Sequence, residues 1–422
     1  GVLFGDLNVR AVKDKNDNII SDGRPSLGFT GNMDTYKPAE GSATRSDIAI
    51  TDPDFKYPSL WKSNIAADYK FGDGWVATVE LLYSKDINAI YHDNIGLYRT
   101  EQFVNDGGAG NARPYYNGYY SDREGNQKAA NHVVMLRNTS KGHSLYTTFQ
   151  LQKNFVDGIL KGLYLNGSYS FGQSRGVTDG TSSVATSAWK YRAALDGNAE
   201  EVGYTAGSFD GRLLLSASYT ANWSKYAATS FGLIYQRYRP FRYSYCYNGD
   251  ANGDSQFSND LMYIPANFDE VKDHLLPGDF DSQEDAWKAM NAFIEQDPYL
   301  SKHRGEYAER NGAVAPFANQ LDLSVSHDIK IYQKNGRSHT LRFSFNIANF
   351  LNLLNRNWGV VQTTVLGNQQ YQFLTIPKGQ GPSAANNYTL KYTMAKDLDE
   401  TFKDNLNDVS RWQMQFGIKY IF

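Results

Sequence analysis

The chain has 422 residues, and its 42 Lys or Arg against 45 Asp or Glu give a formal net charge of -3. No bulk positive charge therefore attracts the chain to nucleic acid, and nucleic acid is not expected as a partner. The single cysteine, Cys246, excludes an intrachain disulfide and a cysteine-built metal site. No uncharged apolar run approaches the ~18 residues that a membrane-spanning helix needs.

Alternation of apolar and polar residues is the main signal along the chain. Residues 1–59 lack it and are interpreted as a loop-rich segment that leads into strands. From residue 60 onward the alternation recurs, as expected for strands with one apolar and one polar face. We predict four hairpins and three further strands: 61–71 with 75–83, 145–153 with 160–172, 212–223 with 227–238, 320–332 with 339–350, and then 359–376, 387–394 and 410–422.

The connections between these strands alternate in length. Those near 73, 157, 225 and 335 are short, whereas the segments 100–130, 173–210 and 246–316 are long. An antiparallel transmembrane β-barrel of the outer-membrane type has this asymmetry, with tight periplasmic turns and long extracellular loops. We therefore predict an all-β chain with barrel strands in 60–245 and 317–422. A soluble β-sandwich or propeller, with its apolar faces packed together, is the alternative.

The final strand strengthens the membrane interpretation. Every second residue is apolar up to the last one, through Trp412, Met414, Phe416, Ile418, Tyr420 and Phe422. A last strand of this kind that ends in Phe resembles the signal read by the barrel-insertion machinery of Gram-negative bacteria. The six residues are therefore predicted to serve as a barrel-assembly signal.

The long segment 246–316 differs from the rest in charge. It carries 12 Asp or Glu and only 2 Lys between residues 246 and 297, so we expect an acidic extracellular loop. Within it Ser282 precedes Glu284 and Asp285, and apolar residues then follow at helical spacing until Pro298. This pattern predicts one short loop helix with an N-terminal Ser cap.

Oxygen-bearing side chains at alternate positions open this loop. Asp250, Asn252 and Asp254 have the spacing of the start of a calcium loop, and Asn259 and Asp260 could add ligands. The match is incomplete, because Ser255 replaces the usual turn Gly and Leu261 replaces the closing Glu. A hydrogen-bonded turn built from the same side chains is the alternative to a calcium site.

Two tyrosine-rich segments are candidates for substrate contact. Flat rings and guanidinium groups can bind peptide or glycan ligands, but they can equally form an interfacial belt whose Arg side chains meet lipid phosphates. The candidate residues are Tyr115, Tyr116, Tyr119, Tyr120, Tyr235, Arg237, Arg239 and Arg242.

No catalytic motif is recognisable. The seven His residues show no metal-binding spacing, and no Ser lies in a nucleophile elbow. The adjacent pairs Asp273 with His274 and His327 with Asp328 would face opposite sides of a strand. We do not expect an enzyme.

Several segments together resemble TonB-dependent outer-membrane transporters of the Oar-like branch, over most of residues 45–422. The matching segments are 51–55 (TDPDF) with Pro58 and Trp61, 250–254 (DANGD), 259–265 (NDLMYIP), 297–300 (DPYL), 303–305 (HRG), 309–312 (ERNG), Pro316 with 321–323 (LDL), 345–350 (FNIANF) and 354–355 (LN).

The resemblance implies active uptake of a large or scarce nutrient across the outer membrane of a Gram-negative bacterium. It implies a barrel of ~22 strands, an amino-terminal plug that contacts TonB, and surrounding lipid and lipopolysaccharide, with a surface lipoprotein as a further candidate partner. Only about ten or eleven strands and no plug are recognisable here, so we expect this chain to be the carboxy-terminal part of a longer protein or to pair with another chain. A structural or adhesive surface barrel and a passive porin are the alternatives.

Overall fold

The structure is a computed structural model that divides into two units, Gly1–Arg45 and Ser46–Phe422. In the first unit, β1 (Val12–Lys13) pairs antiparallel with β2 (Ile19–Ser21). Most of the segment 1–59 that was predicted to be loop-rich lies outside the described residues. The structure describes residues 12–13, 19–21, 47–108, 112–120, 132–180, 182–332, 338–366 and 370–422.

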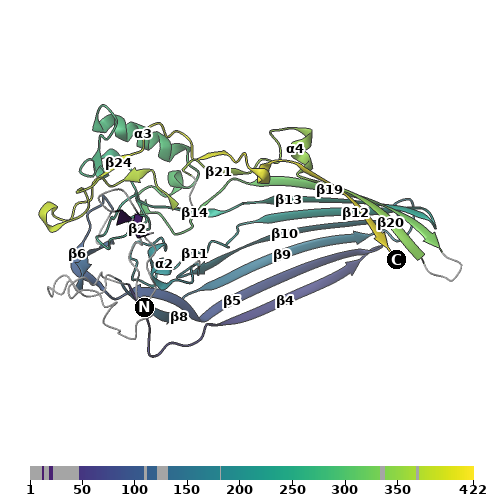
Figure 1. Cartoon of the computed structure of the whole chain (residues 1–422), viewed down its shortest axis with the longest axis horizontal. Coiled ribbons are helices and arrows are strands. Elements are labelled where there is room, and N and C mark those ends of the chain that lie inside the picture. Colours follow the sequence, from purple (N-terminus) through teal and green to yellow (C-terminus); the bar gives the residue numbers. More distant parts are fainter. Residues whose placement is uncertain are drawn as a thin grey trace. The chain divides into compact units, whose positions relative to one another are not determined.

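The second unit contains a twelve-stranded sheet whose nine long strands are antiparallel and follow one another in chain order (Figure 1). Three shorter strands, β3 (Ile48–Thr51), β8 (Val133–Thr139) and β11 (Gly203–Tyr204), extend it locally. The nine long strands, in their order across the sheet, are β4 (Ser59–Phe71), β5 (Trp75–Asn94), β9 (His143–Asn154), β10 (Leu163–Gly176), β12 (Arg212–Ser224), β13 (Ala227–Tyr238), β19 (Ala318–Tyr332), β20 (Ser338–Ala348) and β26 (Gln413–Ile421).

All four predicted hairpins are confirmed, with short turns at one end of the sheet. The long connections all leave from the other end of the sheet, the long-loop end (Figure 1). Among the described residues β4 and β26 are the edges of the row of long strands, each with one long neighbour.

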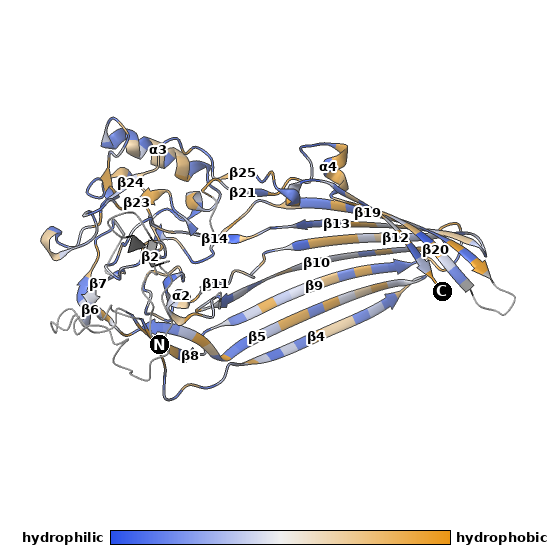
Figure 2. Cartoon of the chain, in the orientation of Figure 1, coloured by the Kyte–Doolittle hydropathy of each residue, from blue (hydrophilic) through white to orange (hydrophobic). Residues whose placement is uncertain are grey.

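Hydrophilic and hydrophobic residues alternate in bands along the long strands (Figure 2), and the strand register places them on different faces of the sheet. On one face apolar residues lie opposite each other in neighbouring strands, as Ile65 does with Leu81 and Phe345 with Phe416. Ile65 is 70% exposed and Phe416 is 67% exposed. On the other face the pairs are polar and bonded to one another; for example, Asn64 donates to Glu80 at 2.6 Å. The predicted period-two alternation is therefore present in the structure.

Two predicted strands are wrong. The segments 359–376 and 387–394 hold only β21 (Gln362–Thr364), β22 (Gln370–Tyr371), β23 (Leu374–Thr375) and β24 (Tyr392–Met394). Tyr371 and Phe373 are both fully buried. Their alternation does not mark a long two-faced strand, because these rings pack into the core formed by the long connections.

The long connections pack together into a second region, here called the loop cluster: the described residues of 95–142, 177–211, 239–317 and 349–412. Its buried side chains come from all four connections, including Trp189, Tyr247, Phe293 and Tyr371. The short strands of this region, besides those already given, are β6 (Leu97–Phe103), β7 (Pro114–Tyr119), β14 (Arg242–Tyr245), β15 (Tyr263–Ile264), β16 (Leu275–Leu276), β17 (Glu306–Tyr307), β18 (Ala313–Val314) and β25 (Phe402–Asp404).

Three α-helices occur in the described residues, all in the long connections; α2 and α3 lie in the packed loop region, and α4 lies against β19. α3 (Gln283–Gln296) begins where predicted, because the Ser282 hydroxyl accepts a hydrogen bond from the Asp285 amide at 3.1 Å. It buries Met290, Phe293 and Ile294. The other helices are α2 (Ala185–Lys190) and α4 (Phe350–Leu354), and the 3-10 turns are η2 (Phe268–Glu270), η3 (Leu300–Lys302), η4 (Ala384–Asn386) and η5 (Asp408–Ser410). Of the helices described, none has the length and apolar character needed to cross a membrane.

Candidate functional site

The predicted calcium loop forms the tip of a small hairpin inside the loop cluster. Cys246 and Leu261 are bridged antiparallel, and the Gly249 amide donates to the Phe257 carbonyl at 2.8 Å. Residues 250–256 close this hairpin. The hairpin therefore brings Asp250 and Asp254 of the tip together with Asp260 on the returning segment, ten positions from Asp250.

Three carboxylates meet at this tip, and they are called the carboxylate cluster below: Asp250, Asp254 and Asp260. Each contributes an oxygen that lies within 4.8 Å of the others. Asp254 and Asp260 are fully buried, and Asp250 is partly buried. Carboxylates this close repel one another, so the arrangement needs protons, a cation or strong hydrogen-bond donors.

Backbone amides supply part of that compensation. Asp250 accepts from the amides of Gly253 at 2.6 Å and Ser255 at 2.8 Å, and the Asn252 side chain accepts from the Asp254 amide at 2.9 Å. The hydrogen-bonded turn offered as one interpretation of the sequence is therefore present. Ser255 has φ +66°, so it adopts the left-handed backbone for which the calcium loop normally uses Gly.

The two predicted Asn ligands behave differently. Asn252 belongs to the turn and donates weakly to Asp254, with its Nδ2 at 3.4 Å from Oδ2. Asn259 is also buried, and its Oδ1 has no hydrogen-bond partner among the described residues. Leu261, which replaces the closing Glu of a calcium loop, packs in the core of the loop cluster.

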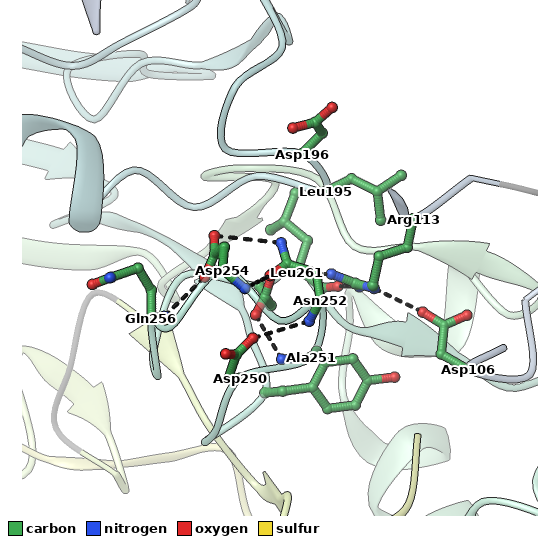
Figure 3. A network of polar contacts seen from close by, with 12 residues as sticks. Asp106, Arg113, Leu195, Asp196, Asp250, Ala251, Asn252, Asp254, Gln256 and Leu261 are labelled. Atoms are coloured by element: carbon green, nitrogen blue, oxygen red, sulfur yellow. Dashed lines mark hydrogen bonds and ion pairs between the residues drawn. The ribbon is translucent and has the colours of Figure 1, made fainter. Parts of the chain in front are cut away.

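Arg113 is the cation beside this cluster, and it comes from a different connection of the sheet (Figure 3). Its fully buried guanidinium lies 2.9 Å from Asp106 and 3.2 Å from Asp260, and it also donates to the Leu261 carbonyl. Asp250 and Asp254 have no ion-pair partner in the described part of the chain. One cation therefore serves a group of four acidic side chains.

The pKa values reflect this shortage of positive charge. Burial, followed by the charges of Asp260 and Asp250, raises the pKa of Asp254 well above its usual range. Burial raises the pKa of Asp260 to about 7, although Arg113 opposes the shift. The pKa of Asp250 is also raised by burial, against the pull of the backbone amides. Either protons or a cation with oxygen ligands, such as Ca²⁺, would relieve this repulsion. Calcium at this site stays a prediction.

The first group of predicted substrate residues is mostly inaccessible. Tyr115, Tyr116 and Tyr119 are buried; the Tyr116 hydroxyl donates to Asp196 at 2.7 Å, and the Tyr119 hydroxyl lies 3.2 Å from His132 Nε2. Only Tyr120 is open, at 50% exposure. The prediction that these three tyrosines contact a ligand is therefore corrected, because their rings are buried between segments of the long connections.

The second group lies at the long-loop end of β13 and just beyond it. Tyr235 donates to Asn319 at 2.8 Å, and Arg237 and Arg239 lie over the ring of Phe317. Arg242 is buried, where it pairs with Asp210 and donates to two backbone carbonyls. Arg242 is therefore corrected from a substrate contact to a residue that holds loops together.

The final strand is confirmed, and its apolar side chains share one face. Met414, Phe416, Ile418 and Tyr420 lie opposite the apolar residues of β20, and all six residues from Trp412 to Phe422 in the predicted signal are exposed. Their role in assembly stays a prediction.

The two Asp–His neighbours do not form pairs. Asp273 is exposed, whereas His274 is buried and bonds the Leu390 carbonyl at 2.8 Å. Asp328 pairs with Arg342 on the polar face of the sheet, and His327 bonds Thr229 at 2.8 Å.

Comparison with models of known protein families, with curated proteins and with solved structures finds no match to this chain. The site residues that sequence reasoning missed are Asp106 and Arg113. Arg113 is 147 positions from Asp260, and no local pattern around it distinguishes a buried cation from a surface one.

Proposed function

We propose that the long strands form part of the wall of a β-barrel in the outer membrane of a Gram-negative bacterium. The observation that carries the proposal is the exposed apolar face of the sheet. Its apolar side chains come from all nine long strands, exposed on eight of them and partly exposed on β20, whereas exposed apolar patches on soluble proteins rarely exceed a few hundred Å². In a soluble sandwich these side chains would be covered by a second layer.

The dimensions of the strands support the same interpretation. A strand needs about 9–11 residues to cross the apolar core of a membrane at a tilt. β10 has 14 residues, β12 has 13 and β26 has 9. Large aromatic residues lie near the ends of the apolar face, such as Trp75 and Trp223 at the short turns and Trp61 at the long-loop end, as in the girdles of membrane barrels.

The edges of the sheet determine how this wall would be completed. Unpaired backbone groups in lipid cost several kcal/mol each, so an open sheet edge is not stable there. β4 and β26 would therefore need further strands, either from the rest of a longer protein or from another chain. This fits a transporter barrel of ~22 strands better than a small barrel.

For activity, we propose energy-dependent uptake similar to that of TonB-dependent transporters of the Oar-like branch, for a large or scarce nutrient. The sequence resemblance and the packed loop cluster at one end of the wall support this proposal. The partners would be outer-membrane lipid and lipopolysaccharide, a plug that contacts TonB, and a surface lipoprotein. The chain itself would carry out no chemistry on the nutrient.

Spin labels can test the membrane placement. In the full-length protein with Cys246→Ser, single Cys residues replace Phe149, Tyr169 or Phe416 on the apolar face, and Thr148, Ser170 or Gln415 on the polar face. We expect labels at the first three positions to collide with lipid-soluble oxygen and labels at the other three with a water-soluble nickel reagent. Equal access of the nickel reagent to both sets would overturn the proposal.

Transport is tested separately. We expect cells that produce the full-length protein to take up labelled peptides or glycans only when TonB is present, because the family is driven through TonB. A steady ion conductance of the purified protein without TonB would instead identify a passive porin. Surface binding without any uptake would identify an adhesive barrel.

A further inference from the structure

Two guanidinium groups share one aromatic ring at the long-loop end of β13. The Arg237 and Arg239 guanidinium carbons lie 4.4 Å and 4.1 Å from the centre of the Phe317 ring. Phe317 immediately precedes β19, the next strand of the sheet. Arg237 and Phe317 are exposed, and Arg239 is partly exposed.

The register of the sheet places Arg237 at the border of the apolar face that lies nearest the long-loop end. Arg237 lies opposite Leu213, Tyr235 lies opposite Leu215, and Leu233 follows on the same face. Leu215 and Leu233 are exposed apolar residues of that face. Arg237 is thus the first charged side chain that continues this row toward the loop cluster, and it does not lie on the polar face.

The positive charge at this position is only partly compensated. Arg239 donates to the Ala315 carbonyl at 2.7 Å, and its Nε lies 3.6 Å from Asp210, which also pairs with Arg242. Arg237 has no ion-pair partner among the described residues. The two cations lie over the same Phe317 ring, and burial together with the charge of Arg237 lowers the pKa of Arg239.

A phosphate group has the chemistry that fits this arrangement. A guanidinium group binds phosphate through two parallel hydrogen bonds. Stacking on one aromatic ring fixes the positions of both guanidinium groups before the phosphate binds. Arg side chains at the border of an apolar band are suited to headgroups, because their stems lie along the apolar surface while the charges reach the interface. A nutrient in the barrel interior would meet the opposite face of the strand.

We propose that Arg237 and Arg239, spaced by Phe317, bind a phosphate group of an anionic lipid in the leaflet that surrounds the long-loop end of the sheet. This inference rests on the proposed membrane placement and names one lipid partner of that surface. The ring of Phe317 would contact the lipid just below its phosphate.

The experiment uses the full-length protein in neutral phosphatidylcholine nanodiscs, titrated with lipid A, and native mass spectrometry counts the bound lipid. We expect Arg237→Gln to weaken lipid A binding about fivefold and Arg237→Gln with Arg239→Gln about 30-fold, because each cation near an anionic surface contributes a similar factor. The matched control is Arg212→Gln. Arg212 is an exposed cation on the polar face of β12 that contacts Gln236 at 3.1 Å, and its loss should leave binding unchanged.

Two further probes identify the source of the phosphate. Dephosphorylated lipid A should bind no better to the wild type than to the double variant, and inorganic phosphate should not compete at millimolar concentration. The inference would be overturned if the wild type bound dephosphorylated lipid A as tightly as lipid A, or if inorganic phosphate competed fully with lipid A. If the double variant binds lipid A normally while the spin labels still report lipid on the apolar face, this inference fails and the proposed function stands.

Discussion

The sheet and the loop cluster of this chain bury apolar surface in opposite ways. In the loop cluster, rings such as those of Tyr247, Phe293 and Tyr371 are enclosed by other segments of the same chain. In the sheet, residues such as Phe416 remain exposed on a face formed by every long strand. The loop cluster thus carries its own core, whereas the apolar face of the sheet is suited to an apolar environment outside the protein.

Charged groups follow the same division. On the sheet, the ion pair between Asp328 and Arg342 lies on the partly exposed polar face. In the loop cluster, Arg113, Asp254 and Asp260 are buried and Asp250 is partly buried, so their pairing and protonation affect stability strongly. The two regions should therefore respond to different substitutions and different solution conditions.

The largest expected effect is the loss of a core ring in the loop cluster. Phe293→Ala should reduce the stability of this region by about 3–5 kcal/mol, because it removes a fully buried aromatic side chain and leaves a cavity. Limited proteolysis and hydrogen exchange should show opening of residues 246–316 while the long strands stay protected. Phe257→Ala, at an exposed position, is the control and should change little. Equal loss of protection in the sheet would contradict the division into two regions.

A charge on the apolar face should come next. Phe149→Arg should cost about 2–4 kcal/mol in a lipid bilayer, since this side chain would face the membrane interior. Thr148→Arg, on the polar face of the same strand, is the matched control. Urea unfolding in liposomes measures both, and heat-modifiable gel mobility checks that each variant assembles. Similar costs for the two variants would show that lipid does not face Phe149.

Calcium should affect only the loop cluster. If Ca²⁺ binds the carboxylate cluster, free Ca²⁺ at 100 times its dissociation constant should stabilise this region by about 2.7 kcal/mol. Asp254→Asn removes a central ligand and should abolish that gain, and Asp273→Asn, at an exposed carboxylate away from the cluster, should keep it. Thermal unfolding with calcium or a chelator measures the effect. A wild type that gains nothing from calcium would leave the turn as the sole role of these residues.

A pH dependence of the loop cluster is also expected in the presence of a chelator. Because the pKa of Asp260 is raised to about 7, the folded cluster holds a proton that the unfolded chain releases near its usual pKa of 3.8. The free energy of unfolding should therefore fall as the pH rises from about 4 to about 7, and then level off. Asp260→Asn should flatten this slope in hydrogen-exchange measurements. A steeper fall in the variant would contradict the assignment to Asp260.

Local patterns were sufficient for a large part of the fold. Alternation and short turns located the four hairpins and the last strand, since each depends on neighbouring residues and on one turn. The Ser282 cap and the stripe through Met290 and Phe293 located α3 for the same reason. The segments 359–376 and 387–394 were wrongly predicted to be long strands, because burial within the loop cluster can produce the same alternation of apolar and polar residues.

The functional residues were less predictable. The Asp250 loop was visible because its oxygen ligands are close in sequence, but the tyrosines at 115, 116 and 119 could not be recognised as buried packing residues. Arg113 gave no signal, since its partners Asp106 and Asp260 depend on how two separate connections meet.

The sequence by itself determined which residues share a face of each strand, because side chains alternate with the backbone and need no distant partner to do so. Only the tertiary structure decided which loops enclose one another, where the carboxylate cluster finds its single cation, and that Arg237 and Arg239 meet over Phe317. These contacts join positions far apart in the chain, and their energies depend on desolvation and packing that local sequence does not specify.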